Sequence, residues 1–142
     1  MPCRPTSLAA LASVALLSAA GAALAQTEPA PELLGSYAPG GDCAREPKVT
    51  LGAKAITIQT GGKSTRLAPI DACYSCEGGA RYEGIVVWVS QLGADRNPIE
   101  PFFYFNAGEK KGALAMEKRG AQNYPPAHRA VAMASPLQRC KK

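Results

Sequence analysis

The sequence predicts an all-β fold, a small antiparallel sandwich or barrel that carries two disulfides. Several segments alternate apolar and polar residues with the period of two that is typical of half-buried strands. Short turns rich in glycine and proline separate these segments, and no long helical pattern lies between them. Four cysteines remain beyond the N-terminal segment, and an even number in a small exported domain is typical of two disulfides.

The first 25 residues are typical of a secretory signal peptide. This stretch holds a single charge, Arg4, and its apolar run at residues 8–23 is short for a membrane span of about 20 residues. Small residues flank Leu24, so we expect cleavage between Ala25 and Gln26. The mature protein is then expected in the periplasm or outside the cell.

The mature chain is expected to form one domain. Residues 26–32 are polar and proline-rich, which favours a flexible leader. Residues 33–142 have the length of a single domain, which we expect to be β-rich and disulfide-bonded. We expect a monomer with no membrane span.

Alternating patterns predict the first strands. Residues 33–37 are a candidate strand, followed by a turn-rich loop. Within residues 48–60, Val49 and Leu51 share a face, and the isoleucines at 56 and 58 do the same. Gly61 and Gly62 predict a hairpin turn into residues 64–68, where Thr65 and Leu67 are expected to face inward.

The second half of the chain is expected to supply the main strands. Residues 82–92 are apolar on both faces and β-branched, which predicts a central strand. Residues 101–107 form an aromatic strand, and residues 108–112 a hairpin turn into residues 113–118, where Leu114 and Met116 share a face. Residues 127–135 fit a short helix or a strand, although their alanines favour helix. Pro136 ends this element, and residues 137–140 close the chain.

Cys73 and Cys76 form a CxxC motif whose chemistry has to be weighed. A thioredoxin-type redox pair begins a helix, but two glycines follow here at 78 and 79. A c-type haem needs histidine at position 77, which is Glu77. A zinc site needs a second close pair of ligands, whereas the other two cysteines lie at opposite ends of the domain.

We therefore expect structural disulfides, Cys73–Cys76 and Cys43–Cys140, while the crossed pairings remain open. In the chain-entropy model the local pair contributes about 2 kcal/mol, and the outer pair about 4–5 kcal/mol.

No catalytic constellation is evident from the sequence. His128 is the only histidine, and we expect it on the surface or in a loop. The stretch GGKST, residues 61–65, lacks the earlier glycine and the following helix of a phosphate-binding loop. We expect no enzyme activity, no cofactor and no metal.

The basic residues hint at a partner. Residues 26–108 carry 7 basic and 9 acidic side chains, whereas residues 109–142 carry 8 basic and 2 acidic ones. A positive surface there would attract anionic polymers or acidic proteins, whereas signatures of nucleic-acid binding are absent from the sequence. The candidate residues of this basic face are Lys110, Lys111, Lys118, Arg119, Arg129, Arg139, Lys141 and Lys142.

Phe102 and Tyr104 share one face of their expected strand and are a candidate aromatic contact patch. The leading functional expectation is an exported, non-enzymatic binding module that docks an anionic envelope component or acidic protein through the basic face. The alternative is a thiol–disulfide or metal-binding protein that uses Cys73 and Cys76. A periplasmic enzyme inhibitor is a minor variant, because a basic protein suits a basic target poorly.

Overall fold

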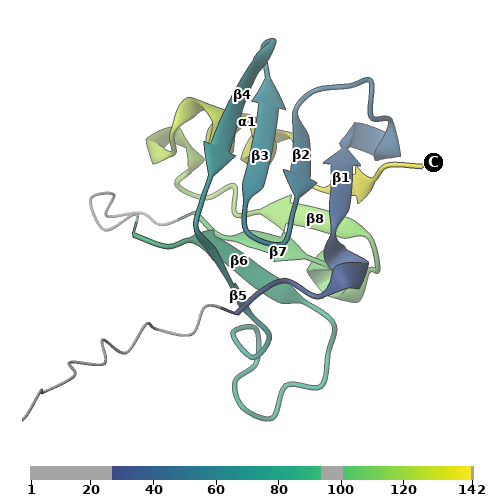
Figure 1. Cartoon of the computed structure of the whole chain (residues 1–142), viewed down its shortest axis with the longest axis vertical. Coiled ribbons are helices and arrows are strands. Elements are labelled where there is room, and N and C mark those ends of the chain that lie inside the picture. Colours follow the sequence, from purple (N-terminus) through teal and green to yellow (C-terminus); the bar gives the residue numbers. More distant parts are fainter. Residues whose placement is uncertain (1–26, 94–100, 142) are drawn as a thin grey trace, which may run out of the picture.

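The computed structural model describes residues 27–93 and 101–141 and contains a nine-stranded antiparallel sheet with one α-helix (Figure 1). The strand order is β4-β3-β2-β1-β9-β8-β7-β6-β5. The strands are β1 (Gly35–Ala38), β2 (Lys48–Leu51), β3 (Ile56–Thr60), β4 (Lys63–Leu67), β5 (Ile70–Cys73), β6 (Val87–Gln91), β7 (Phe103–Phe105), β8 (Ala113–Met116) and β9 (Leu137–Arg139). The helices are α1 (Pro126–Ala134) and the 3-10 turns η1 (Pro31–Leu33), η2 (Pro39–Gly41), η3 (Ala107–Glu109) and η4 (Ala121–Asn123).

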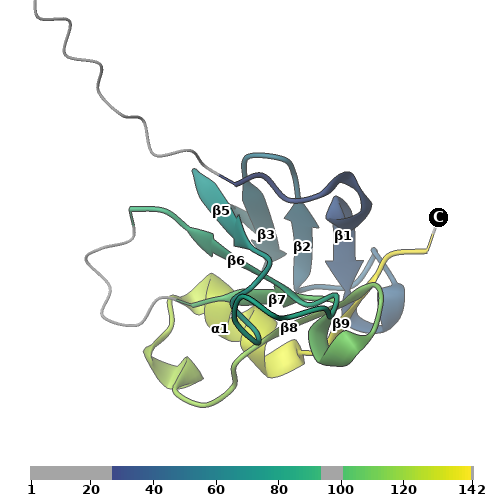
Figure 2. The ribbon, with the colours of Figure 1, turned by 90° about the horizontal axis from the view of Figure 1, so that it is seen from below.

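The sheet curls into a nearly closed barrel. Its two edge strands, β4 and β5, stand at opposite ends of the strand order but are joined in the chain by residues 68 and 69 alone. Two residues span only about 7 Å when extended, so the ends of the sheet must approach each other. Figure 2 shows the two halves of the sheet facing one another, with β1–β3 on one side and β6–β9 on the other. The expected β-barrel or sandwich is therefore confirmed.

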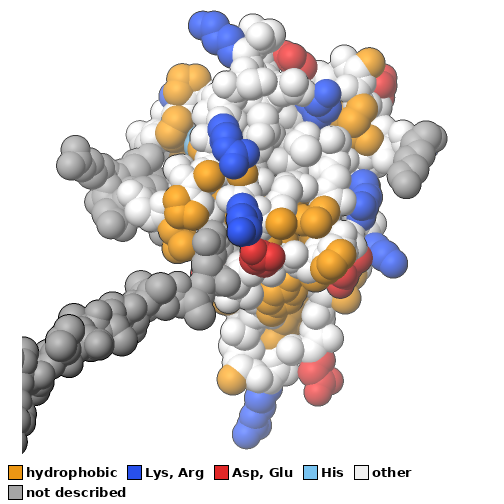
Figure 3. All heavy atoms as spheres, viewed as in Figure 1, with side chains coloured by type: hydrophobic (Ala, Val, Ile, Leu, Met, Phe, Trp, Pro, Cys, Tyr) orange, Lys and Arg blue, Asp and Glu red, His pale blue; other side chains and the backbone are white. Residues whose placement is uncertain are grey.

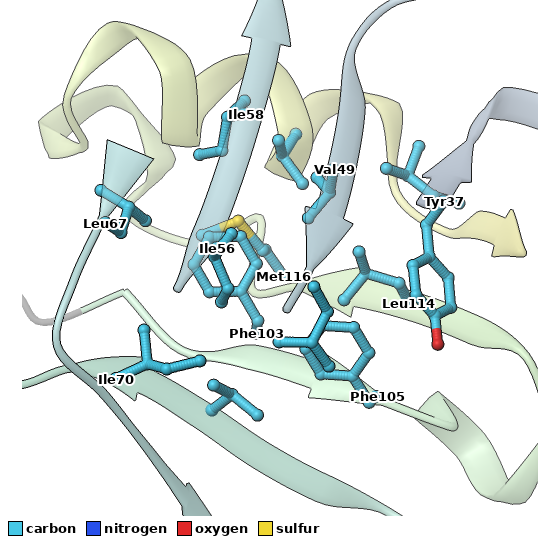
Figure 4. Close-up of a cluster of buried hydrophobic side chains, with 14 of the residues drawn as sticks. Tyr37, Val49, Ile56, Ile58, Leu67, Ile70, Phe103, Phe105, Leu114 and Met116 are labelled. Carbon is cyan, nitrogen blue, oxygen red and sulfur yellow. The ribbon is translucent and has the colours of Figure 1, made fainter. Parts of the chain in front are cut away.

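The core fills the space enclosed by the sheet (Figure 4). In β2, β3, β5, β6 and β7, alternate residues are buried, as the period of two requires. The ring of Tyr37 meets that of Phe105 at 5.2 Å between centroids, and the Tyr37 hydroxyl donates a 2.6 Å hydrogen bond to the Leu33 carbonyl. A core of this kind holds β6 and β7 rigidly from the inside, so their outward side chains are displayed on a fixed frame.

Helix α1 packs against β3 and β8 and contributes Val131 and Ala132 to the core. It resolves the open choice for residues 127–135 in favour of helix, with Pro126 at its first position, where the missing N–H costs nothing. His128, expected on the surface or in a loop, is instead buried in this helix, with its ring 5.7 Å from that of Phe103. The two preceding prolines suggested a loop, but they begin a helix.

The predicted strands are present, but several differ in extent, and two strands were not predicted. Strands β5 and β9 were not expected, and the four residues of β5 run directly into the CxxC motif. Leu33, in the candidate strand 33–37, lies in η1, and the expected strand 101–107 is reduced to β7. Strand β6 covers only 87–91 of the expected 82–92, and Trp88 on its second face is half-buried. On β4, Leu67 is buried as expected, but Thr65 is exposed because β4 is an edge strand with little covering it.

Two disulfides are present, and their pairing is the favoured one. Cys43 joins Cys140 across 97 residues, and Cys73 joins Cys76 across three. The first bridge ties the C-terminal end to the loop after β1, where the Cys140 amide also donates to the Ser36 carbonyl at 2.8 Å.

The N-terminal segment lies against the barrel. Residues 27–32, expected to be a flexible leader, make hydrogen bonds with the β5 edge: the Ala72 amide donates to the Thr27 carbonyl at 3.0 Å, and the Thr27 amide to Asp71 Oδ1 at 2.7 Å. The Ala30 amide donates to the Tyr74 hydroxyl at 2.6 Å. These contacts cover an otherwise unpaired strand edge, which proteins generally protect. Within residues 27–93 and 101–141, no helix is long and apolar enough to cross a membrane.

Candidate functional site

Three aromatic side chains cluster on the outward face of β6 and β7. Trp88 lies directly opposite Tyr104 in the sheet, and their rings meet edge to face at 5.2 Å and 82°. The Phe102 ring lies 5.3 Å from that of Trp88. The alternate residues of these strands, such as Val89 and Phe103, point into the core, so the aromatic cluster faces outward. Solvent-facing aromatic clusters commonly mark contact sites.

Phe102 and Tyr104, the contact patch predicted from the sequence, thus lie in one cluster. Trp88, whose ring contacts both of theirs, was not predicted as part of that patch. Trp88 was expected in a strand buried on both faces. Position 88 falls between Val87 and Val89, so strict alternation, applied to that run, would have placed it on the opposite face.

The aromatic cluster borders a groove. A hollow of about 360 Å³ lies between the β5–β6 loop and η3, and its side chains include Glu77, Trp88, Tyr104 and Glu117. A second hollow of about 430 Å³ runs towards Pro136 and shares Tyr104 and Glu117 with the first. The two hollows share two side chains and therefore adjoin each other on the outer side of the sheet. Together we call them the aromatic groove.

Two carboxylates stand in the aromatic groove. Glu77 Oε2 accepts a 2.7 Å hydrogen bond from Trp88 Nε1, and Glu117 Oε1 accepts one of 2.9 Å from the Arg119 amide. Across the part of the chain that the structure describes, the one ion pair is Lys54–Glu28 at 4.0 Å. Neither groove carboxylate is therefore paired with a described cationic side chain.

Burial raises the pKa of Tyr104, and electrostatic interactions with Glu117, Tyr124 and Glu77 raise it further. The hydroxyl therefore stays neutral at physiological pH and can donate a hydrogen bond within the groove.

The CxxC disulfide sets the position of Glu77. Cys73 ends β5 and lies opposite Trp88 in the sheet, and Cys76 immediately precedes Glu77 in the chain. Closing the bridge turns the chain back over the sheet, which places the Glu77 carboxylate against the indole N–H. No helix begins in the described loop from Tyr74 to Val86, so the helix that activates a thioredoxin-type thiol is missing here.

A second set of contacts holds the end of that loop. The Tyr82 hydroxyl donates to Glu109 Oε1, the Ile85 amide donates to Glu109 Oε2 at 2.9 Å, and the Val86 amide donates to the Tyr82 hydroxyl at 2.9 Å. The bond from Tyr82 lowers the pKa of Glu109, as does that from Ile85. Desolvation and the bond to Glu109 raise the pKa of Tyr82. We call this arrangement the loop clamp.

The residues of the predicted basic face fall into two groups at opposite ends of β8. Lys110 and Lys111 precede the strand, beside Arg139, whose amide donates to the Gly112 carbonyl at 2.8 Å. Lys118 and Arg119 follow the strand, near Arg129, which donates to the carbonyls of Gln122 and Tyr124. Lys141 is exposed at the C-terminal end, and Lys142 lies outside the described residues.

Two of the arginines already bind backbone carbonyls. Arg139 donates to the carbonyls of Glu32 and Leu34, and Arg129 to those named above. On the face seen in Figure 3, Lys and Arg side chains are spread singly and do not form one patch.

Within residues 27–93 and 101–141, no group of three or more His, Cys, Asp or Glu side chains could hold a metal ion. His128 lies on the inner side of β7, against Phe103, and is separated by the sheet from the aromatic groove. Neither family models, nor curated proteins, nor solved structures gave a significant match to this chain.

Proposed function

We propose that this chain is an exported, non-enzymatic binding module and that its ligand-binding surface is the aromatic groove. The observation that carries the proposal is the cluster of Trp88, Phe102 and Tyr104 on the outer side of the sheet, in mutual contact at 5.2–5.3 Å. The three rings are half-buried, so leaving their outer parts at a surface forgoes a fraction of the roughly 1.5–3 kcal/mol that full burial of one such side chain contributes. Such a cost is typical of contact sites, where aromatic side chains supply most of the binding energy.

The rigidity of the groove supports the proposal. Its aromatic floor is held by strands hydrogen-bonded on both sides, and its wall by a disulfide and the loop clamp. A preformed site loses little conformational entropy when a ligand binds. The buried position of His128 leaves the groove without its imidazole, the most common general acid or base, which favours binding over catalysis.

The test uses Trp88 as its own reporter, because it is the only tryptophan in the sequence. Small molecules from a cell-envelope extract are screened by ligand-observed NMR, and the hits are titrated while indole fluorescence is followed. We expect bound ligands to shift the emission, and the double variant Trp88→Ala/Tyr104→Ala to lose the NMR contacts.

Met133→Ala is the matched control, because Met133 is a large apolar side chain that is 64% exposed on α1. If ligands still bind the double variant but no longer bind Met133→Ala, the binding surface lies elsewhere and the proposal is refuted.

A second candidate function is docking of an anionic envelope polymer or acidic protein through basic residues. Lys110 and Lys111, exposed beside Arg139, favour it. We expect Lys110→Glu/Lys111→Glu to abolish retention on envelope material at low salt, whereas Lys54→Glu/Lys63→Glu, exposed on the other half of the sheet, should not. Retention that does not respond to ionic strength would contradict this function.

Export is part of the proposal, and it is supported by the signal-like N-terminal segment and by the oxidised state of all four remaining cysteines. N-terminal sequencing of the protein recovered from the periplasmic fraction should start at Gln26. A thiol–disulfide role for Cys73 and Cys76 remains the alternative, and it requires a bridge that mild reductant opens. Mass mapping under such conditions should find the pair intact.

A further inference from the structure

The aromatic groove contains a corner built from two rings. Trp88 and Tyr104 stand at 82° to each other, with centroids 5.2 Å apart, and both border the same hollow. The face of an aromatic ring carries the negative part of its quadrupole and attracts a cation placed over it. In this edge-to-face pair the edge of one ring covers part of the face of the other, so the corner offers an ion one open face and the uncovered part of the second.

The charged side chains of this hollow also favour a cation. Glu77 and Glu117 both border the hollow, and neither forms an ion pair with a described residue. Among residues 27–93 and 101–141, no Lys or Arg side chain lines this hollow. Lys118 lines the adjoining hollow. Both carboxylates also contribute to the raised pKa of Tyr104, where burial is the first cause. The charged side chains that line this hollow are therefore both acidic.

We infer that the aromatic groove binds an organic ammonium ion, with the alkylated nitrogen against the Trp88–Tyr104 corner and the two carboxylates balancing its charge. This inference rests on the proposed ligand-binding role of the groove and adds the chemical class of the ligand. The hollow of about 360 Å³ is at the lower end of the range of roughly 300–1,000 Å³ that small-molecule sites occupy. It suits a single head group, carried either by a free small molecule or by a lipid.

The decisive experiment compares two ligands of the same shape. Choline and 3,3-dimethyl-1-butanol differ in that a quaternary nitrogen in the first is a neutral carbon in the second. Each is titrated into the oxidised protein at low ionic strength while Trp88 fluorescence is followed, with N-acetyl-tryptophanamide as the quenching control. We expect choline to bind about tenfold more tightly than the neutral alcohol, the difference that a partly desolvated cation–π site gives.

Variants test the two parts of the site separately. Glu77→Gln/Glu117→Gln keeps the hydrogen-bond acceptors and removes the charges, and it should weaken choline binding roughly three- to tenfold. Glu83→Gln is the matched control, an exposed carboxylate that borders neither hollow, and it should leave binding unchanged. Lys118→Ala removes a nearby positive charge and should leave binding equal or tighter. Tyr104→Leu should weaken it.

Two further arms identify the source of the ammonium group. Binding to vesicles of phosphatidylcholine but not of phosphatidylglycerol would identify a lipid head group, and binding to free choline alone would identify a small metabolite. Either result supports the inference.

Equal affinity for choline and the neutral alcohol would overturn the inference. A second result would also overturn it: a neutral chito-oligosaccharide binds, Trp88→Ala/Tyr104→Ala abolishes that binding, and choline does not bind. The groove would then still be the ligand site. If no compound changes the fluorescence of Trp88, while ligands from the envelope extract still bind Trp88→Ala/Tyr104→Ala, the proposed function is refuted as well.

Discussion

At the scale of single residues, His128 is the most unusual side chain. It is 7% exposed, and its Nδ1 is the one buried side-chain polar atom without a hydrogen-bond partner among the described residues. Burial lowers the pKa of His128 from its ordinary value of 6.5, because an unpaired imidazolium is poorly solvated in the core. The folded protein therefore keeps this ring neutral at a pH where the unfolded chain would protonate it.

We expect stability to fall as the pH drops below 6.5. Between that value and the lowered pKa of the folded state, the unfolded chain binds one more proton, so the free energy of unfolding decreases by at most about 1.4 kcal/mol per pH unit. His128→Leu should abolish this dependence between pH 7 and pH 5, as measured by urea unfolding. An unchanged slope in the variant would show that another group is responsible.

Glu109 is the second residue whose pKa makes a contact depend on pH. The hydrogen bond that it accepts from Tyr82 lowers its pKa from the ordinary 4.5, and the hydrogen bond from the Ile85 amide lowers it further. The ionised form thus stabilises the loop clamp above that value, and the contribution is lost as the pH falls through the lowered pKa of the folded state. The protection factor of the Ile85 amide against hydrogen exchange should fall there, whereas in Glu109→Gln it should be low at all pH values. A protection factor that does not change with pH in the wild type would refute this.

At the scale of elements, the β5–β6 loop depends on a glycine. A Cβ at Gly84 would collide with Glu109 Oε1 and the Tyr82 hydroxyl, the two groups of the loop clamp that bond each other. A side chain at position 84 would therefore displace the two groups of the loop clamp from each other.

Gly84→Ala should therefore open the loop clamp and leave the barrel intact. We expect faster exchange at the Ile85 and Val86 amides and a lower melting temperature, with unchanged exchange in β2 and β3. Gly52→Ala is the control, because a Cβ there meets only the Ala55 carbonyl at the ordinary distance of 3.5 Å. Equal effects of the two substitutions would indicate a general glycine effect, not the loss of the loop clamp.

At the scale of the whole molecule, the two disulfides act over very different lengths of chain. Cys43–Cys140 encloses nearly the entire domain and fixes the position of β9, which is inserted between β1 and β8. Cys73–Cys76 encloses four residues and shapes only the wall of the aromatic groove.

We expect Cys43→Ser/Cys140→Ser to lower the free energy of unfolding by about 4–5 kcal/mol, and Cys73→Ser/Cys76→Ser by about 2 kcal/mol, since chain entropy grows with loop length. Urea unfolding of the two double variants measures both values. The second variant should also shift Trp88 emission, because Glu77 is no longer held against the indole. The reverse order of stabilities would contradict this account.

The sequence by itself determined the β-class, the turn at Gly61-Gly62, the inward residues of β2 and β3, and the number of disulfides. All of these follow from local periodicity, turn chemistry and a count of cysteines, so they need no knowledge of distant partners. Two of the three side chains of the aromatic cluster, Phe102 and Tyr104, could be predicted in the same way. The disulfide pairing was favoured but left open, and the structure decided it.

Only the tertiary structure decided the rest. Strand β9 pairs with β1, about 100 residues earlier, and no local pattern specifies such a pairing. The burial of His128 depends on where α1 docks, and the outward position of Trp88 depends on which face of β6 the barrel encloses. Glu77 reaches Trp88 because the CxxC bridge turns the chain, and Glu117 joins them from the residue that follows β8. The groove exists where three separate segments meet, and the closure of the sheet, not any one motif, brings them together.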